Sequence, residues 1–313
     1  MAVKSVASES LVGLNPDFAA RPEGISDRVR QTVALLARRG YALSPERVAQ
    51  VCIGGAISPQ QVRWAVAARR DLAIADDLVV DRDGLAKVDQ IRNRAQGHED
   101  DAGAYVEMTV LFTRSLVTLA PFIRSVSLAG SLASGGFRAS DDVDLNLIVD
   151  DGHRHLAYVV VNALGLVHAL AHRAKPVDDL TRRPIAPRLM TANLILERSQ
   201  YLPLERQDEG MAFELMMAEP LFGLESIQEL IGANPALVEH FPQLADKPAA
   251  LVMEPPVRRL PSPLFPGFLD GAARVLGGTA WQYMQWTRRH HPAALERVRY
   301  VRSTMRPYAL FDR

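Results

Sequence analysis

Apolar residues near the start of the chain recur at helical spacing and predict a first helix. Ser26 is a favourable N-cap, Val29 and Val33 follow on one helical face, and Gly40 ends the segment. Residues 1–25 show no comparable periodicity and contain several glycines and prolines. We therefore expect a flexible arm over 1–25, followed by a folded unit.

Two further helices and a hairpin are predicted after this helix. Ser44-Pro45 and Ser58-Pro59 each place an N-cap before a proline at the first helical position, where the missing N–H costs nothing. The apolar runs on either side of Asp76-Asp77 predict a tight hairpin. Three helices followed by a hairpin indicate a winged-helix-like module, which we place at residues 26–96.

The middle of the chain alternates between helical and strand-like periodicity. Apolar residues over 85–120 predict a long helix that leads into a second unit, and a further helix is predicted over 155–173. Strands are predicted over 123–128, 143–149 and 189–196. This order predicts an α/β (α+β) fold with a small sheet, and we place this core at residues 97–200.

The remainder of the chain, residues 201–313, is predicted to be a helical C-terminal region. Helical spacing recurs over 209–221 and 226–231, and again from residue 267 onward. The intervening residues 234–266 are rich in proline and predict an irregular connection.

Composition limits the class of protein. The 313 residues are 48% hydrophobic and 23% charged, which suits a chain with a sizeable buried core. Thirty-six basic residues balance 36 acidic ones, so no global field attracts nucleic acid or membrane. The only cysteine, Cys52, excludes an internal disulfide and a cysteine-based zinc site. No apolar run approaches the roughly 20 residues that span a bilayer, so we expect a cytoplasmic protein without membrane contact.

Basic residues are concentrated in the first module. Between Arg28 and Asp71 there are eight basic and two acidic residues, and the helix predicted after Ser58 carries Arg63, Trp64, Arg69 and Arg70. One interpretation is a DNA-reading face within residues 28–71. The other is that the arginines only solvate the surface, that Trp64 packs inside, and that the module positions the next unit.

The residues with the clearest chemical meaning lie at the predicted strand over 143–149. Because strand side chains alternate, Asp142 and Asp144 project from one face with Cα atoms roughly 6.6 Å apart, while Val143 and Leu145 face the core. Two such carboxylates repel one another and lose hydration, which a divalent cation offsets. Magnesium is the expected ion, and in a two-metal site these carboxylates would bridge the ions.

A glycine-serine turn precedes these acids. Gly130 allows a ligand to approach the backbone closely, and Ser131 offers a hydroxyl and backbone N–H groups to a phosphate. Ser140 extends this polar loop, and Arg138 could neutralise the charge of a triphosphate. Taken one at a time, the acids and the turn also suit a plain solvent-exposed loop, but their joint occurrence favours a nucleotide site.

The arrangement of Gly130-Ser131, a ten-residue spacer and Asp142-Val143-Asp144-Leu145 resembles the signature of the DNA polymerase beta-like nucleotidyltransferase superfamily. The wider order of elements is similar to that of bacterial nucleotidyltransferase-domain proteins of unassigned substrate. The resemblance implies a small mixed sheet and transfer of a nucleoside monophosphate from a nucleoside triphosphate to a hydroxyl or other nucleophile. Pyrophosphate would leave with the help of magnesium.

The sequence departs from that pattern at the third acid, which usually lies on a later strand. Here the matching position is Asn193, which could coordinate a metal through its amide oxygen but adds no charge and cannot act as a base. In a regular strand Glu197 would share its face but lie roughly 13 Å further along. We therefore expect Asp142, Asp144 and Asn193 as metal ligands.

Several functional questions stay open at this stage. The acceptor could be a small molecule, a protein or an RNA, because the fold does not decide it. An alternative is a DNA-binding regulator that only senses a nucleotide. A further alternative is a catalytically inactive partner protein that keeps the nucleotidyltransferase fold.

Overall fold

The computed structural model describes residues 22–172, 174–176 and 187–289, together with residues 291, 292, 295, 296, 299, 303 and 306–311. Most of the predicted arm therefore lies outside the described residues. Helix α1 spans Pro22–Ala37, so it begins before the predicted start at Ser26. Ser26 is buried inside this helix and does not cap it.

The remaining elements at the N-terminus follow the predicted order. They are α2 (Pro45–Gln50), α3 (Pro59–Ala67), β1 (Leu72–Ala75), β2 (Leu78–Asp81) and α4 (Arg82–Leu85). Ser58 forms a capping box with Gln61 at the start of α3. Asp76 and Asp77 both have positive φ, as a two-residue turn between twisted strands requires. The three predicted helices and the hairpin are confirmed, and we call residues 22–87 the N-terminal module.

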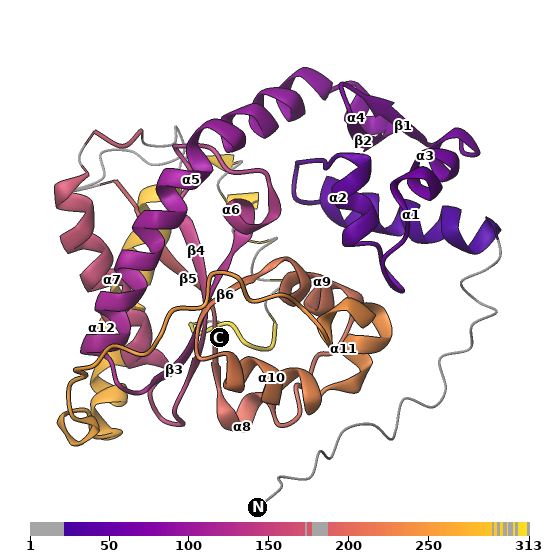
Figure 1. Cartoon of the computed structure of the whole chain (residues 1–313). Helices are drawn as coiled ribbons and strands as arrows, with labels where there is room; N and C mark the ends of the chain where they lie inside the picture. Colours follow the sequence, from indigo (N-terminus) through magenta and orange to yellow (C-terminus); the bar gives the residue numbers. More distant parts are fainter. Residues whose placement is uncertain are drawn as a thin grey trace, which may run out of the picture.

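Helix α5 (Val88–Leu119) runs from the N-terminal module to a four-stranded sheet (Figure 1). The strands are β3 (Ile123–Ala129), β4 (Val143–Val149), β5 (Met190–Glu197) and β6 (Glu219–Phe222), in the order β5-β4-β3-β6. β4 pairs in parallel with β5, whereas β3 pairs antiparallel with both β4 and β6. The mixed α+β class and the small mixed sheet are thus confirmed.

Strand β6 corrects the predicted helix over 209–221. Helix α9 spans Glu209–Met217 and the chain then enters the sheet. Pro220 explains the change, because proline lacks the N–H that a helix interior needs and biases the residue before it toward extended backbone. An edge strand tolerates proline, and β6 lies at the edge of the sheet.

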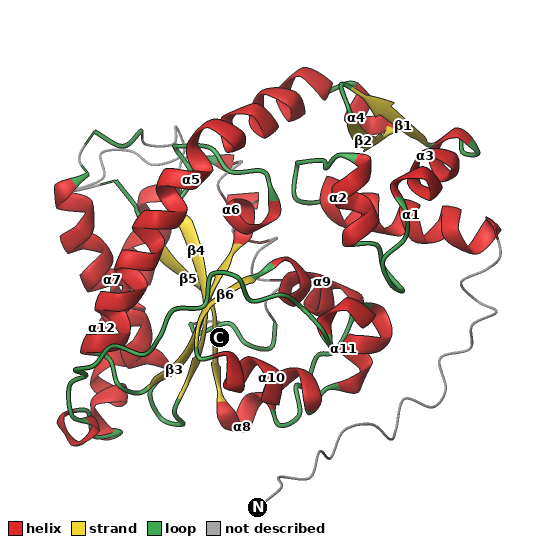
Figure 2. Ribbon diagram, in the orientation of Figure 1, coloured by secondary structure: helices red, strands yellow, loops and turns green. Residues whose placement is uncertain are grey.

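Helices cover both faces of the sheet (Figure 2). On one side α5 and α7 (Arg154–Ala171) pack on the sheet, with α12 (Phe268–Arg288) against α7. On the other side lie α8 (Arg198–Tyr201), α9, α10 (Leu224–Gly232) and α11 (Pro235–His240). Helix α11 and short 3-10 turns at Pro242–Leu244 and Ser262–Leu264 lie within residues 234–266, so the predicted irregular connection is partly helical.

The N-terminal module and helices α8–α11 share one hydrophobic core. Val33 and Val62 belong to the same buried cluster as Phe213 and Phe241, although these residues are far apart in the sequence. The backbone N–H of Gly54 also donates to the carbonyl of His240, at 2.7 Å. The predicted divisions at 96/97 and 200/201 therefore separate segments that are packed against each other in the folded chain.

Within the described ranges, α7 is the one helix long and apolar enough to cross a membrane by length and composition. Ala157, Val161 and Ala169 are buried on one side of it, and the helix packs against β5 and α12. Leu166, Val167 and Leu170 are exposed on the helix, of which 22% is buried.

Candidate active site

A cleft of about 650 Å³ opens where three parts of the chain meet. This volume lies in the range of small-molecule sites, about 300 to 1,000 Å³. Its walls come from the residues after α1, from the glycine-serine turn with the end of β4 nearest to it, and from α9. Among the predicted site residues, the cleft is lined by Gly130, Ser131, Asp142, Asp144 and Asn193.

Asp142 and Asp144 both line the cleft, as their spacing predicts. Asp142 immediately precedes β4, and its carboxylate lies 3.4 Å from the guanidinium of Arg188. Asp144 is the second residue of β4, and its Oδ1 accepts a hydrogen bond of 2.9 Å from the hydroxyl of Thr191. Thr191 is the in-register partner of Asp144 on β5. The sequence alone gives no signal for Thr191, because its role follows from the strand register.

Gly130 is in direct contact with Asp144. It follows β3 and opens the short helix α6 (Gly130–Ser134), with a φ of 62°. A Cβ at this position would lie 2.1 Å from Oδ2 of Asp144. Ala129 and Asp144 are paired across β3 and β4, which is why the turn and the acid meet. Only glycine combines this backbone conformation with so close an approach.

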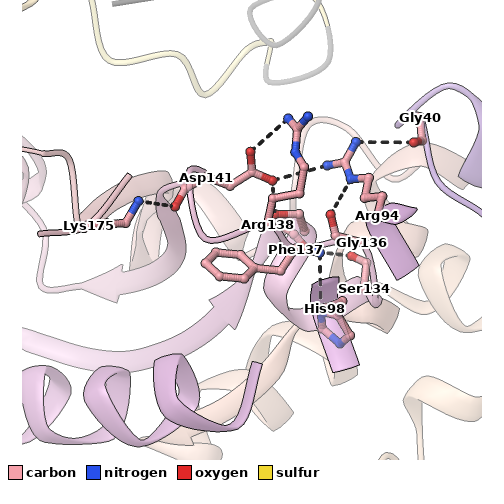
Figure 3. Close-up of polar contacts among 11 residues, drawn as sticks. Gly40, Arg94, His98, Ser134, Gly136, Phe137, Arg138, Asp141 and Lys175 are labelled. Atoms are coloured by element: carbon pink, nitrogen blue, oxygen red, sulfur yellow. Dashed lines mark hydrogen bonds and ion pairs between the residues drawn. The ribbon is translucent and has the colours of Figure 1, made fainter. Parts of the chain in front are cut away.

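Asp141 anchors the loop between the turn and β4 (Figure 3). Its carboxylate is buried, 3.4 Å from the Ser131 hydroxyl and 3.1 Å from the Arg138 guanidinium. Its backbone carbonyl accepts a 2.8 Å hydrogen bond from Lys175. Arg138, predicted to neutralise a triphosphate, is therefore engaged with Asp141. Arg138 and Ser140 are both absent from the described residues that line the cleft.

Arg94 of α5 joins this loop to the N-terminal module. Its guanidinium lies 3.5 Å from Asp141, donates to the backbone carbonyls of Gly136 and Gly40, and lies over the ring of Tyr41 (Figure 3). A Cβ on Gly136 would meet that ring at 2.7 Å. The loop thus rests on the module, and the sequence gives no signal for it because Arg94 is one of many polar residues on a long helix.

Two neutral side chains complete the surroundings of the loop. His98 accepts a 3.3 Å hydrogen bond at Nδ1 from the backbone N–H of Phe137, and burial lowers the pKa of His98, which suits an unprotonated acceptor. Burial raises the pKa of Tyr41 to about 12, so this phenol lines the cleft in its neutral form.

Asn193 lies at a β-bulge, which corrects the expectation of a regular strand. Leu145 pairs with Ala192 and Asn146 pairs with Leu194, so Asn193 has no partner in the β4–β5 register. Its amide nitrogen donates to Oδ1 of Asn146, at 3.0 Å, and to Oε1 of Glu214, at 2.9 Å.

Because of this bulge, the side chains of Asn193 and Glu197 do not share one face of β5, as they would in a regular strand. Glu197 instead caps α8, and its carboxylate accepts a 2.8 Å hydrogen bond from the backbone N–H of Gly152. It lies at the far end of β5, opposite Val149, and takes no part in the cleft.

The opposite wall of the cleft carries charged residues that the sequence does not single out. Glu214 of α9 is mostly buried, and its Oε2 lies 3.6 Å from the guanidinium of Arg39. Arg39 also lies over the ring of Phe213, 4.7 Å from its centroid. Asp208 caps α9 and forms an ion pair with Arg206. Arg38, Arg39 and Arg206 therefore bring basic charge to a cleft that also contains several acids.

The donor set suits magnesium held together with a substrate. Asp142 and Asp144 supply two carboxylates, the hard oxygen ligands that Mg²⁺ prefers. No group of three or more His, Cys, Asp or Glu side chains among the described residues is placed to hold a metal ion. Mg²⁺ commonly binds one or two carboxylates and completes its shell with water and substrate phosphates, so two acids are sufficient. Asn193 is directed to Asn146 and Glu214 instead.

The basic face of the N-terminal module is partly neutralised by ion pairs. Arg63 contacts Glu46 at 2.7 Å, and Arg69 contacts Asp71 at 2.8 Å. Trp64 is 46% exposed on α3, so the expectation that it packs inside is wrong.

The chain matches none of the family models, curated proteins or solved structures with which it was compared. The function is therefore inferred from the geometry of the cleft and from the glycine-serine and Asp-Val-Asp motifs that form it.

Proposed function

We propose that this protein is a magnesium-dependent nucleotidyltransferase, which transfers a nucleoside monophosphate from a nucleoside triphosphate to a nucleophilic acceptor. The observation that carries the proposal is the contact between Gly130 and Asp144 inside a cleft that also contains Ser131 and Asp142. A turn that admits close approach of a phosphate and a pair of carboxylates that suits Mg²⁺ are thus adjacent, as this chemistry requires.

The residues of the cleft have separate roles in the proposed reaction. The backbone of Gly130-Ser131 binds the triphosphate, and Asp144 is held in orientation by the hydroxyl of Thr191. Bound Mg²⁺ would supply charge neutralisation for the triphosphate and for the leaving pyrophosphate. Arg38 at the cleft wall provides further complementary charge for an anionic substrate. The nucleophile then displaces pyrophosphate from the α-phosphorus.

The test uses the full chain with Mg²⁺ and each of the four α-labelled nucleoside triphosphates. Small-molecule and macromolecular fractions of a cell extract serve as acceptors, and pyrophosphate and labelled products are measured. Asp142→Asn and Asp144→Asn should each lower turnover at least about 100-fold, and both should lose the thermal stabilisation given by Mg²⁺ and nucleotide.

Glu225→Gln on the exposed surface of α10 is the matched control and should keep wild-type turnover. Without Mg²⁺ and nucleotide, the two aspartate variants should melt close to the wild-type temperature, because relief of the repulsion between the two carboxylates offsets the weaker contacts with Arg188 and Thr191. Wild-type turnover by the variant that carries both substitutions would refute the assignment.

A nucleotide-sensing DNA-binding regulator is the second candidate. The exposed indole of Trp64, with Arg63 and Arg70 on and just after α3, is the observation that favours it. This candidate would show salt-dependent DNA binding and nucleotide binding without turnover.

A further inference from the structure

Nucleotidyl transfer to a hydroxyl requires a group that accepts the proton of the nucleophile. Asn193 lies near the acidic face of β4, but an amide cannot accept that proton at neutral pH. We propose that Glu214 of α9 is the catalytic base, which removes the proton from the acceptor hydroxyl. This inference rests on the proposed function. It assigns to a carboxylate on helix α9 the role that the amide of Asn193 on β5 cannot take.

The hydrogen bonds of Asn193 place Glu214 beside β4. The Asn193 amide donates to Oε1 of Glu214 and also to Oδ1 of Asn146. Asn146 is two residues after Asp144 on the same strand, and side chains two residues apart share a face. Asp144 and Glu214 both line the cleft. The helix therefore brings a carboxylate to the position where β5 carries an amide.

Both oxygens of Glu214 are oriented by neighbours. Oε1 accepts the 2.9 Å hydrogen bond from Asn193, and Oε2 lies 3.6 Å from Arg39, whose stacking on Phe213 limits its movement. The Glu214 side chain is 15% exposed, so it is reachable from the cleft yet held in place. A carboxylate has about four lone-pair sites, and these two contacts leave sites for an acceptor hydroxyl.

The other acids on this wall are less suited to the role. Asp208 caps the backbone N–H of Met211 and is held by Arg206 at 2.6 Å. Glu209 is in the first turn of α9, about 7.5 Å from Glu214 along the helix axis. Glu214 is the acid of α9 that the amide of Asn193 links to Asn146 of β4.

The proposed step is a displacement at the α-phosphorus. The hydroxyl proton passes to the Glu214 carboxylate as the acceptor oxygen forms its bond to the α-phosphorus. The bond between that phosphorus and the oxygen bridging to the β-phosphate breaks, and pyrophosphate leaves with the electron pair. Glu214 then releases the proton to water, so the carboxylate is restored.

The primary test compares Glu214→Gln with the wild type, using the nucleotide that supports turnover. The loss of a general base should lower kcat about 10² to 10⁴-fold. Binding of the α,β-methylene analogue of that nucleotide with Mg²⁺, measured by calorimetry, should change less than about threefold, because Gln keeps the size and the oxygen acceptor of Glu. A merely structural role would weaken binding and kcat together.

Two further variants test the role of the carboxylate directly. In Glu214→Ala, added formate should enter the vacated space and raise kcat at least tenfold, whereas chloride at the same ionic strength should not. In the Glu214→Gln background, Asn193→Asp should recover part of the lost turnover, because it restores a carboxylate one hydrogen bond away.

These results distinguish failure of the Glu214 assignment from failure of the proposed nucleotidyltransferase function. If Glu214→Gln keeps a kcat within threefold of wild type, or if Glu209→Gln carries the loss instead, the role of Glu214 is overturned while the effects of Asp142→Asn and Asp144→Asn still support the transferase. Absence of formate rescue in a folded Glu214→Ala variant also overturns it. If the wild type neither binds nor turns over any of the four nucleotides, the proposed function fails, and the base assignment with it.

Discussion

Gly130→Ala is the substitution whose effect can best be derived from the structure. The added Cβ would lie 2.1 Å from Oδ2 of Asp144 and 2.9 Å from its Cβ and Cγ, which is closer than non-bonded atoms approach. The carboxylate therefore has to rotate away, and because the Asp144 Cβ is fixed to its backbone, the pairing of Ala129 with Asp144 between β3 and β4 has to widen slightly as well. The substitution therefore displaces one of the two proposed metal ligands without changing it chemically.

The expected cost has two parts. An alanine at a φ of 62° costs about 1–2 kcal/mol because its Cβ crowds the following carbonyl. Displacing Asp144 also breaks its hydrogen bond from Thr191, and a hydrogen bond to a charged group contributes about 1.5–3 kcal/mol. We expect the free energy of unfolding to fall by about 2.5–5 kcal/mol.

Gly152→Ala is the matched control for backbone strain. Gly152 has a φ of 77°, and an added Cβ meets nothing within 4 Å, so this variant should lose only about 1–2 kcal/mol. Gly103→Ala, in an open position of α5, should gain about 0.5–1 kcal/mol because alanine favours the helix. The difference between the Gly130 and Gly152 variants measures the contact with Asp144.

Urea denaturation of the three variants gives these free energies, and thermal shift with Mg²⁺ and nucleotide reports the site. Gly130→Ala should lose the ligand-dependent shift and turnover, whereas Gly152→Ala should keep both. A Gly130→Ala protein as stable as Gly152→Ala, with the ligand-dependent shift intact, would refute the role assigned to this contact.

Two other predictions concern the C-terminal helix and the DNA-binding alternative. Asp270 accepts hydrogen bonds from the backbone N–H groups of His155 and Leu156, and its carboxylate also contacts the His155 ring. Burial raises the pKa of Asp270, but these contacts outweigh the effect of burial and hold the pKa below its ordinary value. Its folded-state pKa is thus below the unfolded value of about 3.9, so its stabilisation is present above that pH and is lost as pH falls through the folded pKa. Asp270→Asn should lower the unfolding free energy by about 1–3 kcal/mol at pH 7, and urea denaturation should show this difference shrinking below about pH 4, whereas a constant difference would contradict it. If the module binds DNA, Arg63→Gln and Arg70→Gln should each reduce the slope of log affinity against log salt by about 0.9, and absence of any gel shift at low salt would count against the regulator.

Local backbone chemistry explains which elements the sequence predicts well. The N-cap at Ser58 and the hairpin turn at Asp76-Asp77 depend on residues within a few positions of each other, and the structure confirms them. The placement of Asp142 and Asp144 on one side of the strand also depends only on their spacing of two residues, and both residues line one cleft. The predicted start of α1 at Ser26 is wrong, because the helical backbone continues back through Ile25 and Gly24 to Pro22 and Ser26 does not cap it.

Long-range pairing explains what the sequence could not predict. The apolar pattern over 209–221 continues past Met217. Pro220 is a local signal against a helix there, but only the pairing with β3 shows that Glu219–Phe222 joins the sheet. The bulge at Asn193 depends on the register between two strands more than 40 positions apart along the chain, and a regular alternation counted along one strand cannot contain it. The common face of Asn193 and Glu197 inferred from that count is therefore wrong. Thr191, which pairs with Asp144 before the bulge, is the neighbour of that carboxylate on β5.

The walls of the cleft were unpredictable for a related reason. Arg39, Arg94 and Glu214 come from three separate regions of the chain, and none belongs to a motif. Arg39 and Glu214 meet because the N-terminal module and α9 contribute to the same hydrophobic core, and Arg94 lines the cleft from α5. A pattern search along the sequence finds the acids and the turn, but the charged groups that surround them become visible only when the core is known.

Because the N-terminal module shares a hydrophobic core with α8–α11, it is part of the structure that forms the cleft. Gly136 rests on the ring of Tyr41, and Arg94 ties the carbonyl of Gly40 to the buried carboxylate of Asp141, so the module supports the loop that leads to the proposed metal ligands. A module attached only to present a DNA-reading helix would have no need of these contacts. Figure 1 draws α3 on the side of the module away from the sheet. Because the inner side of the module forms the wall of the cleft, its packing is part of the site whether or not its outer side binds a partner.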